Sequence, residues 1–354
     1  MEPRTTIQRA HILDVIKTLS QFRGAPKYML LLGAGAPASS GVPLAADLVI
    51  DLLRVEYCAK KKVRFRDARL QPESRIRAWA MKALPWFDPF DCNSSEYEQV
   101  MTNVLRLPDA RNEFLRGKLA KAKPSKGYRR LGSLISKGVF TTIWTTNFDH
   151  LVRACTHHLL EPIEEVNAPD QFSTLDVSST RRRLIRLHGD FWHGDLVSTP
   201  EDIRKVPAVR YEALRRLLLS QGLIVVGYGG RDREIMNTLI ETARDPNVLH
   251  QGLFWCVRRD ETIPPLGKGL FEACNQRAYL VEIEGFDQLI ADIDRSLGRD
   301  SVARSSTIIF SSDDSDLTWE GQALLSELAE ALTLDSPCAQ VRQYQNKRAL
   351  RRNW

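Results

Sequence analysis

The sequence predicts an α/β protein built on a Rossmann-like parallel sheet with helices on both faces. Short apolar runs recur along the 354-residue chain, and stretches with helical spacing separate most of them. Four of these runs end directly in a glycine-rich or polar motif. Strands that alternate with helices usually pair in parallel, and strands covered on both faces are continuously apolar. The composition, 43% hydrophobic and 27% charged, is typical of a globular domain.

Six apolar runs are the predicted strands. They cover residues 28–32, 139–144, 184–187, 223–226, 253–257 and 279–283. Apolar residues at helical spacing predict helices between and before them, at 7–19, 44–55, 214–220 and 234–243.

A helical insertion module is predicted at about residues 58–126. This stretch is charged, helical in pattern and without strand-like runs. Its basic run at 60–66 fits a solvated helix face or loop. The alternative interpretation is a contact with nucleic acid or a partner subunit.

We expect residues 1–299 to form one domain. Residues 300–316 are polar and serine-rich and predict a linker. Residues 317–354 predict a C-terminal helical segment, with one amphipathic helix at 317–334. The basic end of this segment also fits the start of a further region.

Charge and cysteine content narrow the class of protein. The formal net charge of +6 suits anionic ligands such as phosphates. None of the six cysteines forms a C-x-x-C pair, which argues against a structural zinc site and a disulfide framework. No apolar run reaches 18 residues, and no secretory signal is visible. We therefore expect a cytoplasmic protein without a membrane span or bound metal.

Two of the strand-end motifs are glycine-rich turns. The first begins Gly33-Ala34-Gly35, and the second begins Gly227-Tyr228. Glycines let the backbone approach a pyrophosphate, and the N-terminus of the next helix favours its charge. Since no glycine stands at position 38, the first motif is not the G-x-G-x-x-G of dehydrogenases. Purely structural turns explain such glycines equally well.

The other two motifs are polar. Thr146, Asn147 and Asp149 follow one strand, and His188 follows the next. In a parallel sheet these positions meet at the carboxyl edge, where ligands bind. His188 suits general-base chemistry near neutral pH. The competing interpretations are a helix cap at Asn147–Asp149 and a structural histidine, and His193 is a weaker candidate base.

In order and spacing, the four motifs together resemble the sirtuin superfamily over about residues 28–283. The resemblance implies a Rossmann-like sheet, a smaller helical module and NAD in the cleft. It implies that Asn147 and Asp149 line the nicotinamide pocket and that His188 is the general base. The NAD-binding residues it implies are Gly33, Ala34, Gly35, Ser40, Gly41, Val42, Pro43, Asp47, Thr146, Gly227 and Tyr228.

Departures from the sirtuin pattern argue against protein deacylation as the activity. Pro37 stands where the family usually has serine or threonine, and Val42-Pro43 lacks the Asp-Phe-Arg that follows in deacylases. The 36 residues between Asp190 and Gly227 contain no cysteine, so the zinc ribbon of deacylases is missing.

The chain is more similar to the sirtuin-like NAD-degrading effectors of bacterial antiphage defence. That resemblance implies an NAD hydrolase that releases nicotinamide and ADP-ribose, or a cyclic form of it, without a metal. It also implies a homo-oligomer and a sensor or ATPase partner, fused or separate. The alternatives are an NAD-dependent deacylase or ADP-ribosyltransferase, and a non-catalytic module that binds NAD or ADP-ribose. Direct nucleic-acid contact is not predicted.

Overall fold

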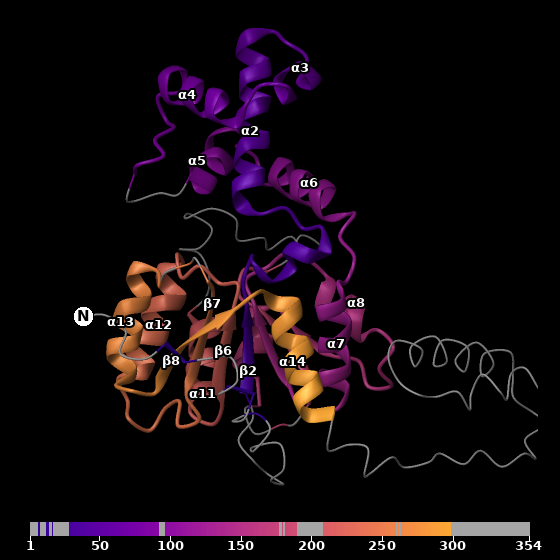
Figure 1. Ribbon diagram of the computed structural model, residues 1–354, viewed down its shortest axis with the longest axis vertical. Coiled ribbons are helices and arrows are strands. Elements are labelled where there is room, and N and C mark those ends of the chain that lie inside the picture. Colours follow the sequence, from indigo (N-terminus) through magenta and orange to yellow (C-terminus); the bar gives the residue numbers. More distant parts are fainter. Residues whose placement is uncertain are drawn as a thin grey trace, which may run out of the picture. The chain divides into compact units, whose positions relative to one another are not determined.

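The sheet predicted from the sequence is present and entirely parallel in its pairing. The computed structural model describes residues 6–7, 12–13, 16, 28–91, 96–176, 179, 181–189, 208–259, 261 and 263–298. Within these residues, eight strands form one sheet in the order β1-β8-β7-β6-β2-β3-β5-β4 (Figure 1). The strands are β1 (Thr6–Ile7), β2 (Tyr28–Leu32), β3 (Thr142–Thr145), β4 (Glu164–Val166), β5 (Arg183–Arg186), β6 (Gly222–Val226), β7 (Leu253–Arg258) and β8 (Ala278–Ile283).

Both edge strands were missed by the sequence analysis. Each of the six predicted strands overlaps an observed one, but β1 and β4 are additional. The helix predicted over 7–19 is wrong at its start, because Ile7 pairs with Val281 in the sheet. Ile12, Leu13 and Ile16 are helical, and the rest of that stretch lies outside the described residues.

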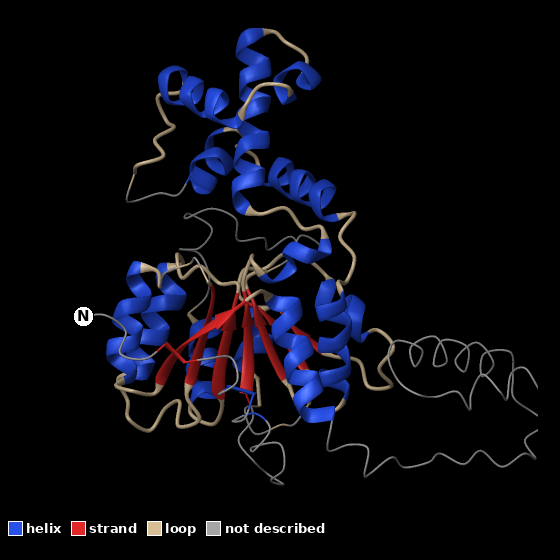
Figure 2. Ribbon diagram, viewed as in Figure 1, coloured by secondary structure: helices blue, strands red, loops and turns tan. Residues whose placement is uncertain are grey.

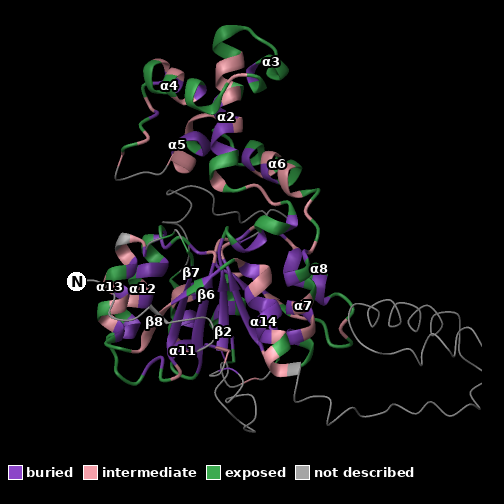
Figure 3. Cartoon of the chain, viewed as in Figure 1, coloured by how far each residue is buried: buried purple, intermediate pink, exposed green. Residues whose placement is uncertain are grey.

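Helices cover both faces of the sheet (Figure 2). One face is covered by α7 (Lys126–Ser136), α8 (Leu151–Thr156) and α14 (Phe286–Gly298). The other is covered by α9 (Pro169–Ser173), α11 (Val209–Leu218), α12 (Arg233–Ala243) and α13 (Pro265–Cys274). Leu30 and Leu32 point to the first core, while Met29 and Leu31 point to the second. This alternation is the period of a strand, and it buries β2 on both faces (Figure 3).

The helical module has a hydrophobic core of its own. Its helices are α2 (Ala45–Lys61), α3 (Phe65–Arg69), α4 (Glu73–Ala83), α5 (Glu96–Asn103) and α6 (Pro108–Leu119). Side chains from Leu48 to Leu115 pack together in this core. The module therefore begins near Ala45, earlier than the predicted residue 58, because α2 is one continuous helix. The basic run at 60–66 is exposed, as a solvated segment requires.

The remaining sequence predictions fall partly outside the described residues. The chain divides into two compact units, residues 1–301 and 302–354. The predicted linker at 300–316 and the predicted C-terminal segment at 317–354 lie outside the described residues. Cys256 is buried in β7, as a core residue should be. No helix in the described part is long and apolar enough to cross a membrane.

The order of the strands reverses at β2. From β2 the sheet continues through β3 and β5 on one side, and through β6, β7 and β8 on the other. Such a reversal leaves a crevice at the carboxyl ends of the strands, which is where open α/β sheets bind ligands. All four sequence motifs follow strands near this point.

Candidate functional site at the carboxyl edge of the sheet

The two glycine turns pack against each other across the reversal point. The Gly33 amide donates to Val226 O at 3.0 Å, and the Gly35 amide donates to Gly227 O at 2.8 Å. A Cβ on Gly33 would lie 2.4 Å from Tyr228 Cα, and one on Gly227 would lie 2.3 Å from Ala36 N. Gly227 also has a φ of +66°, which favours glycine. Packing alone thus requires these glycines, whatever they bind.

The first glycine-rich motif, which begins at Gly33, exposes two consecutive residues shortly after β2. Ala34 and Gly35 are exposed, and a 3₁₀ helix, η1 (Ala36–Ser40), follows them. Gly41, with a φ of +79°, ends this helix in the left-handed region. Val42 and Pro43 are half-buried and lead into α2.

Ser40 and Asp47 already have structural partners. Ser40 is buried, and its Oγ accepts a hydrogen bond from the Ser125 amide at 3.1 Å. Its carbonyl accepts from the Lys123 amide, so Ser40 ties η1 to the end of the helical module. The Asp47 carboxylate accepts from the Leu44 amide at 2.9 Å and caps α2.

Asn147 is held over the end of β2. Its Nδ2 donates to Gly33 O at 3.0 Å, and its amide donates to Thr145 Oγ1 at 3.0 Å. The side chain is buried, and no described residue pairs with its Oδ1. That oxygen is therefore available to accept a hydrogen bond from a ligand or a water. Thr146 lies beside it, half-buried, with its amide bonded to Leu32 O.

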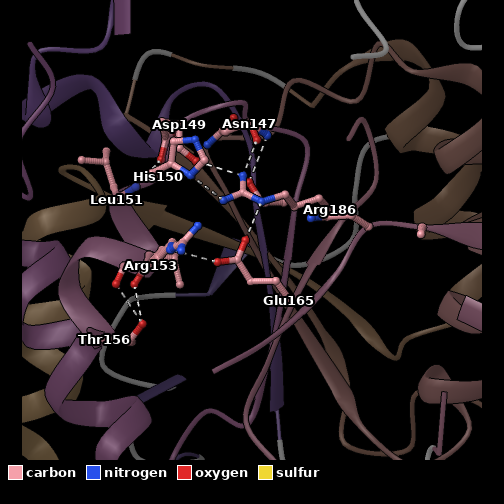
Figure 4. Close-up of polar contacts among 12 residues, drawn as sticks. Asn147, Asp149, His150, Leu151, Arg153, Thr156, Glu165 and Arg186 are labelled. Atoms are coloured by element: carbon pink, nitrogen blue, oxygen red, sulfur yellow. Dashed lines mark hydrogen bonds and ion pairs between the residues drawn. The ribbon is translucent and has the colours of Figure 1, made fainter. Parts of the chain in front are cut away.

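Arg186 supports this loop from within the sheet. Its side chain is almost fully buried, and Nη1 donates to Asp149 O at 2.9 Å and to Asn147 O at 3.4 Å. Figure 4 shows the guanidinium between this loop and the carboxylate of Glu165, to which Nε donates at 3.4 Å. Arg153 lies on the other oxygen of Glu165, at 3.5 Å. A planar guanidinium can hold several acceptors at once in fixed geometry, so Arg186 fixes the backbone that carries Asn147 and Asp149.

Asp149 is buried with one oxygen unpaired. Oδ1 accepts from the Leu151 amide at 3.0 Å, from the position before the N-cap His150 of α8, but Oδ2 has no partner among the described residues. Burial raises the pKa of this carboxyl, and the Leu151 amide and the charge of Arg186 only partly oppose that rise. Both the cap and the pocket interpretation of Asp149 are thus compatible with its position.

His188 is paired with a carboxylate that the sequence analysis did not single out. Its Nε2 lies 2.5 Å from Asp232 Oδ2, and its ring centroid lies 6.4 Å from that of Phe148. Tyr228 is buried near this pair, and its hydroxyl has no partner in the described part of the chain. His193 lies outside the described residues.

Three polar residues of the site were missed: Arg186, Arg210 and Asp232. Arg210 is buried and donates to Leu187 O at 2.8 Å and to Asn167 O at 2.9 Å, directly before His188. The sequence carried a signal for Arg186, since a charged residue inside an apolar strand run requires buried partners. Nothing local marks Arg210, whose partner Leu187 is 23 residues away. Asp232 ends the second glycine-rich motif, but its partner His188 is 44 residues away, so the sequence did not indicate their pairing.

The described residues contain no cluster of three or more His, Cys, Asp or Glu side chains able to hold a metal ion. The site contains one imidazole, two buried carboxylates, a buried amide and glycine-lined backbone, and the buried guanidinium groups of Arg186 and Arg210 support its loops. These groups can orient a polar ligand and accept a proton from it.

Proteins similar to this chain are found among solved structures and in one sequence family. No curated protein sequence matches the chain. Solved structures similar to it include a Sir2 homologue variant in complex with ADP-ribose, at 14% identity and a TM-score of 0.43. That match covers 83% of this chain and 98% of the other. A structure described as the structural basis for the mechanism and regulation of Sir2 enzymes has 14% identity and a TM-score of 0.41, covering 82% and 99%.

The sequence family described as SIR2-like domain matches residues 141–279. This range contains three of the four motifs, from Thr146 through His188 to Tyr228. It also contains β3 to β7, whose carboxyl ends form most of the candidate site. The SIR2-like family model thus matches the part of the chain that carries most of the candidate site, in agreement with the resemblance to the sirtuin superfamily.

Proposed function

We propose that the protein is an NAD hydrolase that cleaves the bond between nicotinamide and ribose. The observation that carries the proposal is the placement of Asn147, Asp149 and His188 at one carboxyl edge, beside the glycine turns at the strand-order reversal. Thr145 and Arg186 are paired in register, so the loops that follow them, carrying Asn147 and His188, leave the sheet side by side. The match of residues 141–279 to the SIR2-like family model supports NAD as the substrate.

The chemistry follows from these groups. The carbon–nitrogen bond breaks with its electron pair going to nicotinamide, which leaves as a neutral molecule, and the ribose carbon gains oxocarbenium character. The free Oδ1 of Asn147 orients a water, and His188 takes a proton as that water attacks. Asp149 stabilises the developing positive charge through its unpaired Oδ2. The exposed backbone of Ala34 and Gly35 approaches the pyrophosphate, and Gly227 and Tyr228 lie on the adenosine side.

We further propose that the activity is regulated, as in the sirtuin-like effectors of antiphage defence. An unregulated NAD hydrolase would deplete the NAD of its own cell. Oligomerisation, or a sensor or ATPase partner, is the expected control. The support for this part is the family resemblance.

The test is NAD turnover by the purified chain, followed as nicotinamide and ADP-ribose by chromatography at several protein concentrations. Loss of a well-placed general base usually costs about 10²- to 10⁴-fold in rate. We expect a loss of that size in His188→Ala and Asn147→Ala. His157→Ala is the matched control, since His157 is exposed and its ring contacts the carbonyl of Ala154 and the ring of its neighbour His158.

Three results would contradict the proposal. Unchanged turnover in His188→Ala would rule out His188 as the general base. Consumption of NAD only in the presence of an acyl-lysine peptide would identify a deacylase. A thermal shift with NAD but no turnover at any concentration would favour a binding module.

A further inference from the structure

The contact between His188 and Asp232 spans the site. His188 follows β5 and Asp232 follows β6, and β2 and β3 lie between those strands in the sheet. The two side chains nevertheless meet at 2.5 Å, with exposures of 15% and 6%. The pair therefore crosses the carboxyl ends of β2 and β3, beside the loop that carries Asn147.

Asp232 is held rigidly. It is the N-cap of α12, and its Oδ1 accepts from the Ile235 amide at 3.3 Å. A helix N-terminus favours a negative charge, and a cap requires only one of the two carboxylate oxygens. The second oxygen, Oδ2, is directed to His188. The capping role of Asp232 explains the position of Oδ1, but it does not explain why Oδ2 contacts the imidazole of His188.

Asp232 is ionised at neutral pH. Burial alone would raise its pKa, but the hydrogen bond and charge of His188, with the amides of Ile235 and Glu234, outweigh burial and hold that pKa below its ordinary value. Tyr228 and Tyr211 also face Asp232, and burial raises the pKa of both phenols, so they stay neutral. Glu234 and Arg210 are the other charges near Tyr211.

An ionised carboxylate only accepts hydrogen bonds, so the Nε2 of His188 must carry the proton. In the neutral ring the lone pair is then on Nδ1, which has no partner among the described residues. We infer that Asp232 is a positioning residue, which fixes the tautomer and orientation of His188 and makes Nδ1 the atom that accepts the proton. This inference rests on the proposed function, since it assigns the partner of the proposed base.

Asp232→Asn is a selective test, because asparagine caps a helix about as well as aspartate. The fold is kept while the negative charge is lost.

Removing the carboxylate partner of a catalytic histidine can cost up to about 10⁴-fold in turnover in other enzymes. We expect a loss of about 10²- to 10⁴-fold, with a melting temperature within a few degrees of the parent. Glu234→Gln is the matched control, an exposed carboxylate of the same helix turn. Turnover equal to that of the parent in Asp232→Asn would overturn the inference.

A second readout does not require NAD cleavage. In histidine-labelled protein, ¹H–¹⁵N correlation spectra report which nitrogen of His188 carries the proton, and His188→Ala identifies the signal. We expect protonated Nε2 in the parent and a mixture of tautomers in Asp232→Asn. An inactive chain with protonated Nε2 would keep the pair and contradict the proposed function. An active chain with protonated Nδ1 would keep the function and contradict the pair.

Discussion

At the scale of single residues, the buried carboxyl of Asp149 lowers the stability of the folded chain when it is ionised. It is a buried carboxyl with an unpaired oxygen, and burial raises its pKa. Its proton therefore binds more tightly in the folded than in the unfolded chain. The ionised form at neutral pH destabilises the fold, and this effect disappears as the pH falls through the raised pKa.

We expect Asp149→Asn to reduce NAD turnover without reducing stability. The amide keeps the acceptor for the Leu151 amide and removes the buried charge. Near pH 7 the melting temperature should be unchanged or higher, by about 2–4 °C for each kcal/mol gained. The difference from the parent should shrink as the pH is lowered towards the raised pKa. Thermal unfolding over a pH series and NAD turnover measure the two effects.

Asp294→Asn serves as the comparison for that variant. Asp294 pairs with the half-exposed Lys137 at 3.1 Å, and such pairs contribute about 0–1 kcal/mol. We expect a small loss of stability and normal turnover. A clear drop in the melting temperature of Asp149→Asn at neutral pH would show that the ionised carboxylate stabilises the fold.

At the level of the elements, apolar composition predicted the central strands of the sheet correctly but did not reveal the two edge strands, β1 and β4. The central strands are buried on both faces, so their apolar runs were visible in the sequence. β4 reads Glu-Glu-Val, with only Val166 buried, and β1 has two residues. Such edges are defined by their neighbours rather than by their own composition. The motifs were likewise visible, but contacts such as His188–Asp232 depend on tertiary structure and were not.

We expect Gly33→Ala to disrupt the junction between β2 and β6. The new Cβ would meet backbone atoms of Tyr228 and Gly227 at 2.4 and 2.5 Å, and backbone cannot turn aside as a flexible side chain can. Overpacking of this kind typically costs about 1–3 kcal/mol. Denaturant unfolding measures the loss, and NAD affinity should fall with it.

Gly117→Ala is the matched substitution. Gly117 lies in α6, and a Cβ there would meet nothing within 4 Å. Alanine in a helix is about 0.5–1 kcal/mol more favourable than glycine, so this variant should be equal to or more stable than the parent. If Gly33→Ala were as stable as Gly117→Ala, close packing would not be the reason for glycine at position 33.

At the scale of the described molecule, three hydrophobic cores lie within the single compact unit of residues 1–301. Two cores lie on the faces of the sheet, and the third belongs to the helical module. The module contacts the site directly, because Phe148 packs against its core and the Lys123 amide bonds to Ser40 O. Its existence was predictable from the absence of strand runs. Its start at Ala45 was not, because the amphipathic pattern of α2 also fits a helix packed on the sheet.

We expect the helical module to open independently of the sheet. Ile76 is fully buried in the module core, and Ile→Ala substitutions in cores cost about 2–5 kcal/mol. In Ile76→Ala, hydrogen exchange should speed up in α2, α4 and α5, while amides of β2 and β6 keep their protection. Leu289→Ala, in the core under α14, should have the reverse pattern. NAD affinity should weaken in Ile76→Ala, because Phe148 loses part of its support. Equal loss of protection in the module and the sheet would instead show that both unfold as one cooperative unit.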